Sequence, residues 1–216
     1  MPKSRDDLIA SYDRIAARYA EEFFDELRDK PDDVAWLDRF VGAVRPGGTV
    51  LDIGCGPGQT CAYFRGTGIE AVGIDLSEGM IREARARLPE VRFECRSYLD
   101  LGREDGSVAG VVGFYALIHE SRDGLPAAMA EIDRVLEPGA PLLLTLHGGS
   151  GVLRADEWFG EPVIIDATCF TTDEVRTVLD ACGFEVESVI ERAPYDFEFP
   201  IPRLYAFARA GRASKA

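Results

Sequence analysis

Apolar side chains recur along this chain at the spacings of helices and of short buried strands. Near the start, Leu8, Tyr12, Ile15, Tyr19 and Phe23 follow one another in steps of three and four, which places them on one face of a helix. A second helix is expected after Pro31 and ends at the turn over residues 45–48. Together these elements predict a helical cap over residues 1–45.

From residue 49 onward, short apolar strands alternate with helices. Strands are predicted at 49–53, 70–74, 91–95, 108–114 and 141–146, and helices begin after the first strand, at Ser77, near Pro126 and at a capping box formed by Thr171 and Glu174. Two final strands, near 184–190 and 204–209, have only a proline-rich loop between them, so they should pair antiparallel. The pattern predicts a Rossmann-like, doubly wound α/β fold with a mostly parallel seven-stranded sheet and a C-terminal antiparallel hairpin.

The segment from Gly148 to Phe170 shows neither spacing and is expected to be irregular. Loops longer than about 15 residues are usually lids, binding loops or disordered segments. Trp158 and Phe159 argue against disorder, so residues 148–170 are predicted to be a substrate lid, with a loop packed on the sheet edge as the alternative. The chain 1–216 is expected to form a single domain.

Composition and charge narrow the range of partners. The chain has 216 residues, of which 46% are hydrophobic and 29% charged, and no apolar run approaches the roughly 20 residues of a membrane span. A net charge of −14 disfavours binding to phosphate backbones and anionic membranes. We therefore expect a small-molecule substrate, no nucleic acid, no membrane, and a monomer or homodimer.

The cysteines and the N-terminus indicate a cytoplasmic location. Five scattered cysteines without a CxxC pair, and only two histidines, favour neither a disulfide framework nor a metal site. Residues 1–7 are polar and lack the apolar segment of a secretory signal. A reducing cytoplasm fits both observations.

The most informative stretch is VLDIGCGPG at residues 50–58. Its glycines, Gly54, Gly56 and Gly58, allow a sharp turn and remove side chains that would collide with a ligand lying on it. The turn follows the first strand, at the edge where open α/β sheets bind ligands. Asp75 ends the second strand, twenty-one positions after Gly54, where a carboxylate can accept both ribose hydroxyls of an adenosine.

A nicotinamide-binding oxidoreductase would also combine glycines with a downstream acid. Its GxGxxG pattern would require glycine at position 59, where this chain has Gln59. That alternative is therefore weaker than a site for another adenosine cofactor.

Four stretches resemble the class I S-adenosylmethionine-dependent methyltransferases, from about Tyr12 to the end of the chain. They are VLDIGCGPG, GIDLSEGMI, DGSVAGVVGFYALIHE and RVLEPGAPLLLT. The resemblance is to bacterial small-molecule methyltransferases and implies an enzyme that uses S-adenosyl-L-methionine and releases S-adenosyl-L-homocysteine. The methyl group would go to oxygen, nitrogen or carbon of the acceptor. An inactive S-adenosylmethionine-binding regulatory protein is the second hypothesis.

The resemblance also implies which residues contact the cofactor. They are Tyr12, Tyr19, Asp52, Gly54, Cys55, Gly56, Gly58, Asp75, Leu76, Met80, Ser97, Tyr98, Phe114 and Tyr115. The glycines would line the methionine part, Asp75 would hold the ribose, and residues 76 and 80 would face the adenine. Ser97 departs from the aspartate that the family often has there. The two N-terminal tyrosines would close over the methionine end, or else serve as core aromatics.

Two histidines are candidates for the general base. His119 follows the fourth strand by about one turn, and His147 ends the fifth strand on the same rim of the sheet. A neutral imidazole can accept a proton near pH 7. Either side chain could instead only shape the pocket, and no metal is expected in the reaction.

Overall fold

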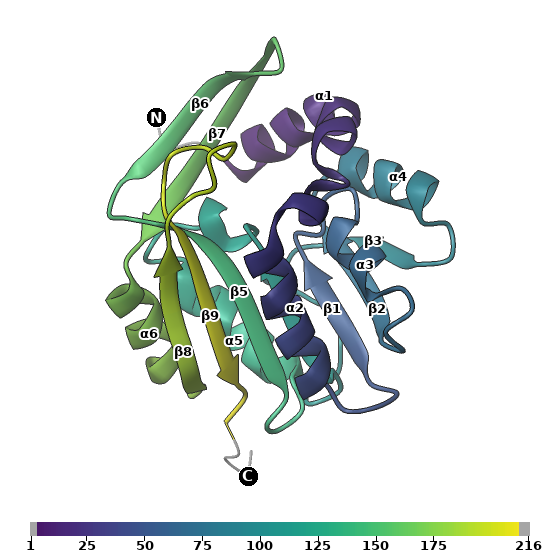
Figure 1. Cartoon of the computed structure of the whole chain (residues 1–216), viewed down its shortest axis with the longest axis vertical. Helices are drawn as coiled ribbons and strands as arrows, with labels where there is room; N and C mark the ends of the chain where they lie inside the picture. Colours follow the sequence, from purple (N-terminus) through teal and green to yellow (C-terminus); the bar gives the residue numbers. More distant parts are fainter. Residues whose placement is uncertain (1–3, 212–216) are drawn as a thin grey trace.

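The computed structural model describes residues 4–211, so the ends of the predicted domain, 1–3 and 212–216, lie outside the described residues. Within this range nine strands form one sheet (Figure 1). The strands are β1 Thr49–Ile53, β2 Glu70–Asp75, β3 Arg92–Cys95, β4 Gly110–Phe114, β5 Pro141–Gly148, β6 Val152–Trp158, β7 Glu161–Phe170, β8 Glu185–Arg192 and β9 Arg203–Arg209. The helices are α1 Arg5–Phe23, α2 Pro31–Ala43, α3 Gln59–Phe64, α4 Glu78–Arg87, α5 Leu125–Val135 and α6 Thr172–Ala181, with short 3₁₀ turns η1 Glu26–Asp29 and η2 Leu117–His119.

The predicted doubly wound topology is confirmed. Strands β3, β2, β1, β4 and β5 lie side by side in this order and run parallel. Strand β9 then lies antiparallel between β5 and β8, with Ala206 opposite Leu144 on one side and Val189 on the other. The carboxyl ends of β1, β2, β4 and β5 therefore meet at one edge of the sheet.

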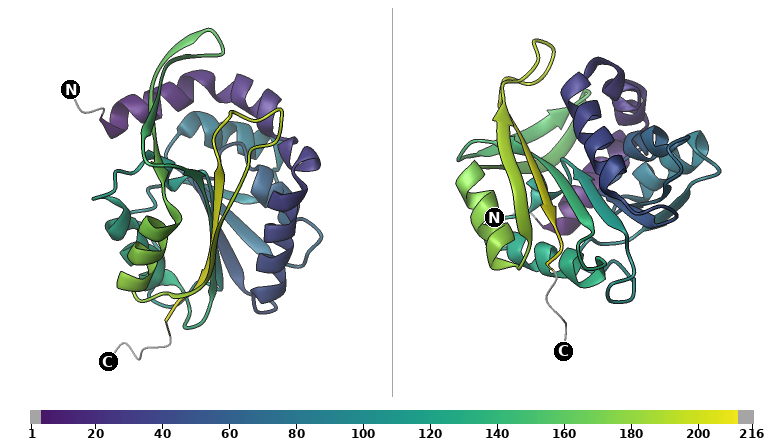
Figure 2. Two further views of the ribbon diagram at one scale, coloured as in Figure 1. Left: turned by 60° about the vertical axis from the view of Figure 1, so that its left-hand side comes forward. Right: turned by 60° about the horizontal axis from the view of Figure 1, so that its bottom comes forward.

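Helices cover both faces of the sheet (Figure 2). On one face, Phe40 of α2 and Phe64 of α3 pack against the sheet residues Val50 and Leu143. The other face carries α5 and α6, whose buried side chains join a second cluster with alternate residues of the same strands. The central parallel strands β1, β4 and β5 are buried on both sides, which explains their near-continuous apolar sequences, whereas the edge strand β3 is partly exposed. Among residues 4–211 no helix is long and apolar enough to span a membrane.

The prediction of an irregular segment at 148–170 is wrong. Strands β6 and β7 form a long antiparallel hairpin that rises from the sheet (Figure 1) and packs against α1 through β7, and β7 joins the end of β5 in a short parallel pairing. The hairpin turns at Phe159 and Gly160, whose φ angles are 57° and 79°, as in a two-residue type I′ turn. Phenylalanine is not a usual residue for that turn, and most of β6 is exposed. The sequence therefore shows neither the usual turn residues nor the alternating apolar side chains of a hairpin. With β6 and β7 the sheet has nine strands in place of the predicted seven.

Helix α1 lies across the carboxyl edge of the sheet and is fastened to α4. The Asp13 carboxylate accepts hydrogen bonds from the Ser77 hydroxyl (2.6 Å) and from the backbone N–H of Gly79 (2.8 Å), at the first turn of α4. A Cβ at Gly79 would lie 2.9 Å from the Asp13 Cα. The two helices thus approach closely, and α1 covers the end of β2.

Candidate functional site

The three glycines of the turn after β1 lie in different surroundings. All have positive φ, between 53° and 93°. A Cβ at Gly54 would lie 2.4 Å from the Ala116 Cβ, and one at Gly58 would meet Leu88 and Phe93 at 3.1 Å. Close packing therefore requires glycine at positions 54 and 58, whatever binds at the turn.

Gly56 is the least crowded of the three glycines. A Cβ there would meet only Gln59 Oε1 at 3.6 Å and Tyr19 Cε1 at 3.9 Å. The Gln59 Oε1 atom is buried and has no hydrogen-bond partner among the described residues. An unpaired acceptor over a bare stretch of backbone fits a polar ligand that carries a donor, such as the ammonium of an amino acid.

Asp75 holds the turn from the next strand. Its Oδ2 accepts the N–H of Gly56 and its Oδ1 accepts the N–H of Ser77, both at 2.9 Å. Burial raises the pKa of this carboxyl, and the backbone donors act in the opposite direction. Because each oxygen can accept a second hydrogen bond, the carboxylate retains capacity for the two hydroxyls of a ribose. The residues therefore fit an adenosine cofactor.

Asp52 and Cys55 have buried side chains. Asp52 accepts a hydrogen bond from the Cys61 thiol at 3.3 Å, and burial raises the pKa of the Asp52 carboxyl to about 7. Cys55 packs in an apolar cluster with Ile81 and Phe93. These contacts give both side chains a structural role beside the turn.

The residues expected near the adenine lie around the ends of β2 and β3. Leu76 is half-buried, whereas Met80 is almost fully buried in α4. Ser97 Oγ accepts the N–H of Leu99 at 3.0 Å. Tyr98 donates its hydroxyl to Glu120 at 2.7 Å. The Arg5 guanidinium, at the start of α1, donates to Ser97 and to Glu120 and lies over the Tyr98 ring. Helix α1 therefore also covers this end of the site.

His119 is held by one contact on each side of its ring. Its Nδ1 lies 2.9 Å from the carbonyl oxygen of Asp166 in β7, and its Nε2 lies 2.8 Å from the Tyr12 hydroxyl. A carbonyl only accepts, so Nδ1 carries the proton and Nε2 accepts from Tyr12. Burial lowers the pKa of His119. The neutral ring thus presents a basic nitrogen towards α1.

Tyr12 and Tyr19 belong to an aromatic group beside the glycine turn. Their rings are 6.1 Å apart, and Trp158 from β6 lies 6.4 Å from the first and 5.5 Å from the second. Burial raises the pKa of both phenols, so they stay protonated at neutral pH. Trp158 completes this group and comes from the β6–β7 hairpin, which the sequence pattern did not predict.

His147 pairs with Tyr115 at the ends of β5 and β4. Their rings are 5.2 Å apart, and the His147 Nδ1 and the Tyr115 hydroxyl are buried without a hydrogen-bond partner among residues 4–211. Burial and the nearby Arg203 lower the pKa of His147 to about 3. Tyr115 has a φ of 54°, a strained value for a residue other than glycine. Phe114, just before it, packs against the α2 face of the sheet.

Beside this pair the fold assembles a group of charged residues that the sequence did not reveal. We call it the charged cluster: Glu26, Lys30, Asp33, Arg192, Glu198 and Arg203. Its members come from η1, the start of α2, the end of β8, the β8–β9 loop and the start of β9. Their positions are far apart in sequence, and none lies in a motif, so only the fold brings them together.

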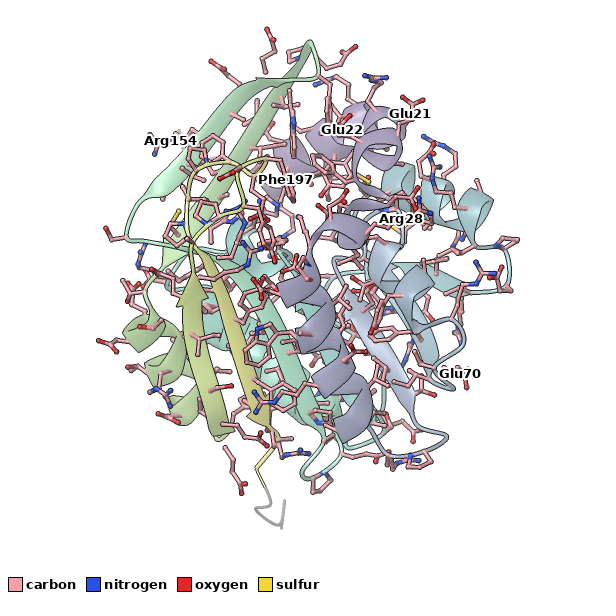
Figure 3. All side chains as sticks on the ribbon, viewed as in Figure 1. Glu21, Glu22, Arg28, Glu70, Arg154 and Phe197 are labelled. Atoms are coloured by element: carbon pink, nitrogen blue, oxygen red, sulfur yellow. The ribbon has the colours of Figure 1, made fainter. Side chains whose placement is uncertain are left out.

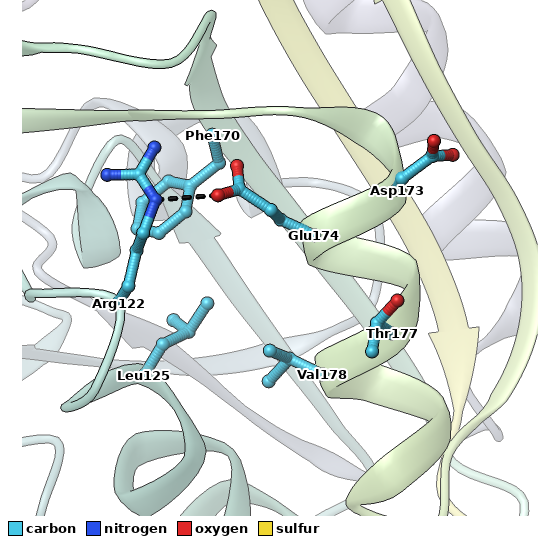
Figure 4. A pocket seen from close by; sticks show the side chains of 7 residues that line it. All are labelled: Arg122, Leu125, Phe170, Asp173, Glu174, Thr177 and Val178. Carbon is cyan, nitrogen blue, oxygen red and sulfur yellow. Dashed lines mark hydrogen bonds and ion pairs between the residues drawn. The ribbon is translucent and has the colours of Figure 1, made fainter.

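A surface cavity of about 330 Å³ lies at the start of α6 (Figure 4). Its lining is largely apolar, with Leu125, Phe170 and Val178, and an ion pair of 2.6 Å joins Arg122 to Glu174 across it. No predicted site residue lines this cavity.

Comparison with known proteins points to one family. Residues 50–139 match the family described as a methyltransferase domain. A demethylmenaquinone methyltransferase of Beutenbergia cavernae is 29% identical over 67% of this chain and 59% of its own length. A malonyl-[acyl-carrier protein] O-methyltransferase of Serratia marcescens is 32% identical over 55% of this chain and 46% of its own length. The chain thus spans about half the length of these curated relatives.

Solved structures share the fold. An S-adenosylmethionine-dependent methyltransferase of Methanosarcina mazei superposes with a TM-score of 0.72 at 20% identity, covering 80% of this chain and 96% of that chain. The methyltransferase in complex with the Trm112 activator of Haloferax volcanii gives a TM-score of 0.75 at 22% identity, covering 97% of this chain and all of that one.

Proposed function

We propose that this chain is a class I S-adenosylmethionine-dependent methyltransferase, in keeping with the match of residues 50–139 to the methyltransferase domain family, and that it transfers the methyl group of S-adenosylmethionine to a small-molecule acceptor. The observation that carries the proposal is the pairing of Asp75 with the bare turn at Gly56. It leaves acceptor capacity for a ribose beside an open stretch of backbone. The net charge of −14 favours a small molecule over nucleic acid as acceptor.

The cofactor, when bound, supplies a methyl group that its positive sulfur activates for displacement. The residues of this chain bind and shield it. Asp75 holds the ribose hydroxyls, and the backbone at Gly56 leaves room for the methionine part. The side chains near β2 and β3 border the adenine. Tyr12, Tyr19 and Trp158 exclude water from the reacting end, which favours charge-neutralising transfer.

We assign the handling of the acceptor proton to Tyr12 and His119. The Tyr12 hydroxyl donates to His119 Nε2 and is the group that an acceptor hydroxyl or amine can reach. As the acceptor loses its proton to the Tyr12 oxygen, Tyr12 passes its own proton to Nε2. The Asp166 carbonyl keeps the ring oriented during the transfer. His147, whose pKa is about 3, is the poorer base and contributes to the pocket wall.

The β6–β7 hairpin takes the place of the predicted lid in this proposal. It contributes Trp158 to the aromatic group and the Asp166 carbonyl to His119. A hairpin that contacts both α1 and the base is placed to select the acceptor. We expect the protein to act in the cytoplasm as a monomer or homodimer.

Methyl transfer itself is the direct test. Wild-type protein is incubated with methyl-labelled S-adenosylmethionine and a small-molecule extract, and the release of S-adenosylhomocysteine is followed together with the label. Enzymatic turnover with label in a small molecule is the expected result. Cofactor binding without turnover across extracts would instead support the regulatory alternative. The Asp75→Ala variant is the negative control, because it removes the proposed ribose contacts and leaves His119 in place.

A further inference from the structure

Three buried cations surround one carboxylate in the charged cluster. The side chains of Lys30, Arg192 and Arg203 are 8%, 12% and 6% exposed. Each contacts Glu198: Lys30 Nζ at 3.4 Å, Arg192 Nη1 at 2.7 Å and Arg203 Nε at 3.4 Å. Arg192 also reaches the second Glu198 oxygen at 3.2 Å. This is a preformed site for a carboxylate, with a two-pronged guanidinium contact.

The carboxylate in this site belongs to the loop between β8 and β9. The Glu198 side chain is 3% exposed, whereas its neighbours Phe197 and Phe199 are 62% and 63% exposed (Figure 3 labels Phe197). This is the reverse of the usual pattern, in which aromatic side chains are buried and charged ones are exposed. A second contact, from the Tyr195 hydroxyl to Asp32, lies at the exposed surface. Glu198 Oε2 also accepts the Tyr195 N–H at 2.9 Å, and Arg203 donates to the Phe199 carbonyl oxygen at 3.3 Å. The loop is therefore held inward by polar contacts of Glu198 and Arg203 and not by apolar burial.

Unpaired polar atoms lie in the same region. The Tyr115 hydroxyl, His147 Nδ1 and Asp33 Oδ2 are buried and have no hydrogen-bond partner within the described range. Lys30 Nζ and the Arg203 guanidinium carbon each lie 5.8 Å from the centre of the Tyr115 ring. A buried polar atom that lacks a hydrogen-bond partner destabilises the folded protein. Such atoms beside a strained residue are expected where a ligand supplies the missing partners.

A chain of contacts joins the charged cluster to the glycine turn. Lys30 Nζ lies 2.6 Å from Glu26 Oε2, and the other oxygen of Glu26 accepts from Gln59 Nε2 at 3.3 Å. Gln59 follows the turn directly and lies over Gly56. A ligand in the cluster would therefore lie beside the proposed cofactor site.

We propose that the charged cluster binds the methyl acceptor, and that the acceptor carries a carboxylate which replaces Glu198 between Lys30, Arg192 and Arg203. This inference rests on the proposed function and names its substrate class. Glu198 acts as a tethered carboxylate that occupies the site until the acceptor displaces it and the loop moves outward.

The charges of the cluster favour one carboxylate over a phosphate. Without Glu198, three cations face two acids that are less than a fifth exposed, Glu26 and Asp33. Asp32 also lies 3.7 Å from Arg192, but it is 57% exposed and therefore screened by water. The buried part of the site thus has one uncompensated positive charge. A single carboxylate neutralises it. A phosphate dianion would leave a negative charge buried, which is costly.

The test uses benzoate as the probe, with benzamide as its neutral analogue and inorganic phosphate as the other anion. Glu198→Gln keeps the shape of the side chain but removes its charge, so benzoate should bind this variant at least tenfold more tightly than wild type in calorimetry. Adding Lys30→Met to Glu198→Gln should abolish the gain. The control is Glu187→Gln, which removes an exposed acid that also pairs with two arginines and should leave benzoate affinity unchanged.

Three results would overturn the proposal: equal benzoate affinity in Glu198→Gln and wild type, equal binding of benzamide, or tighter binding of phosphate than of benzoate. If Glu198→Gln fails to fold, hydrogen exchange in the wild-type protein tests the same proposal. Saturating benzoate should then accelerate amide hydrogen exchange in residues 193–202, and unchanged exchange would contradict displacement of the loop.

Titration of the wild-type protein with S-adenosylhomocysteine tests the proposed function separately. Absence of that binding would defeat the methyltransferase proposal while leaving the benzoate result standing.

Discussion

The imidazole of His119 is fixed between a carbonyl and a phenol, and this determines which of its nitrogens can accept a proton. The Asp166 carbonyl holds the Nδ1 proton, and Nε2 faces the Tyr12 hydroxyl. Burial lowers the pKa of the ring, so it is neutral at physiological pH. The side chain therefore meets the geometric and protonation requirements of a base.

Replacing this base should slow the chemical step more than it weakens cofactor binding. His119→Gln is expected to lower kcat about a hundredfold or more, because a general base typically contributes 10²–10⁴-fold. Tyr12→Phe should lower kcat in the same direction, since it removes the hydroxyl between acceptor and base. Initial rates of S-adenosylhomocysteine release measure both variants. A loss in His119→Gln below about tenfold would leave only a role in pocket shape.

His147 permits a residue-scale test that needs no acceptor. Its pKa falls from an ordinary 6.5 to about 3 in the folded protein. Below pH 6.5 the unfolded chain therefore binds a proton that the folded chain does not, and the folded state loses about 1.4 kcal/mol per pH unit. The stability of wild type relative to His147→Gln should be constant above pH 7 and fall with this slope between pH 6 and 5. Denaturant unfolding at each pH measures it, and a difference that stays constant through pH 5 would contradict the burial of a neutral ring.

Sequence spacing located some of these residues and not others. Asp75 ends β2, Gly56 lies in the turn after β1, and His119 follows β4 by about one turn, so their place at the carboxyl edge could be predicted from local pattern alone. Lys30 and Arg203 could not, because they meet only when β9 inserts beside β5 and α2 covers that edge. Their signal is burial of charge, which appears only in the folded chain.

Among the elements, α1 and the β6–β7 hairpin decide how closed the site is. The amphipathic spacing predicted α1 correctly, and the tyrosines on that face contact Trp158 from the hairpin. The hairpin was missed because only one face of a two-stranded ribbon meets α1, so most of β6 carries exposed polar side chains. Regularly spaced apolar side chains indicate a buried strand, and β6 has few of them because most of its side chains are exposed.

The contact between α1 and α4 can be tested by removing a single carboxylate. Asp13→Ala deletes the acceptor of the Ser77 hydroxyl and the Gly79 N–H at the start of α4. We expect a loss of about 1–2 kcal/mol in the free energy of unfolding, the usual effect of removing a helix cap. Glu22→Ala, an exposed acid on the same helix, should change stability by less than about 0.5 kcal/mol. Equal effects of the two substitutions in denaturant unfolding would show that α1 is not fastened through Asp13.

For the whole molecule, the strand order explains why one edge carries all the chemistry. The ends of β1, β2, β4 and β5 meet there. The charged cluster from η1, α2 and the β8–β9 hairpin lies beside them, and α1 and the β6–β7 hairpin cover the edge. Alternation of strands and helices was enough to predict this topology, because each element has its own periodic pattern. Closure of the site was not predictable, since it depends on contacts between segments more than a hundred residues apart, such as Tyr12 with Trp158.

The central claim is that Asp75 and the turn at Gly56 hold S-adenosylmethionine. Calorimetric titration of the cofactor into wild type, Asp75→Ala and Glu70→Ala tests it most directly, because Glu70 is an exposed acid at the other end of the same strand. Asp75→Ala should lose about a hundredfold or more in affinity, since it removes two hydrogen bonds to a charged group that contribute about 1.5–3 kcal/mol each, while Glu70→Ala should match wild type. Equal affinity in all three proteins would place the cofactor elsewhere and contradict the account.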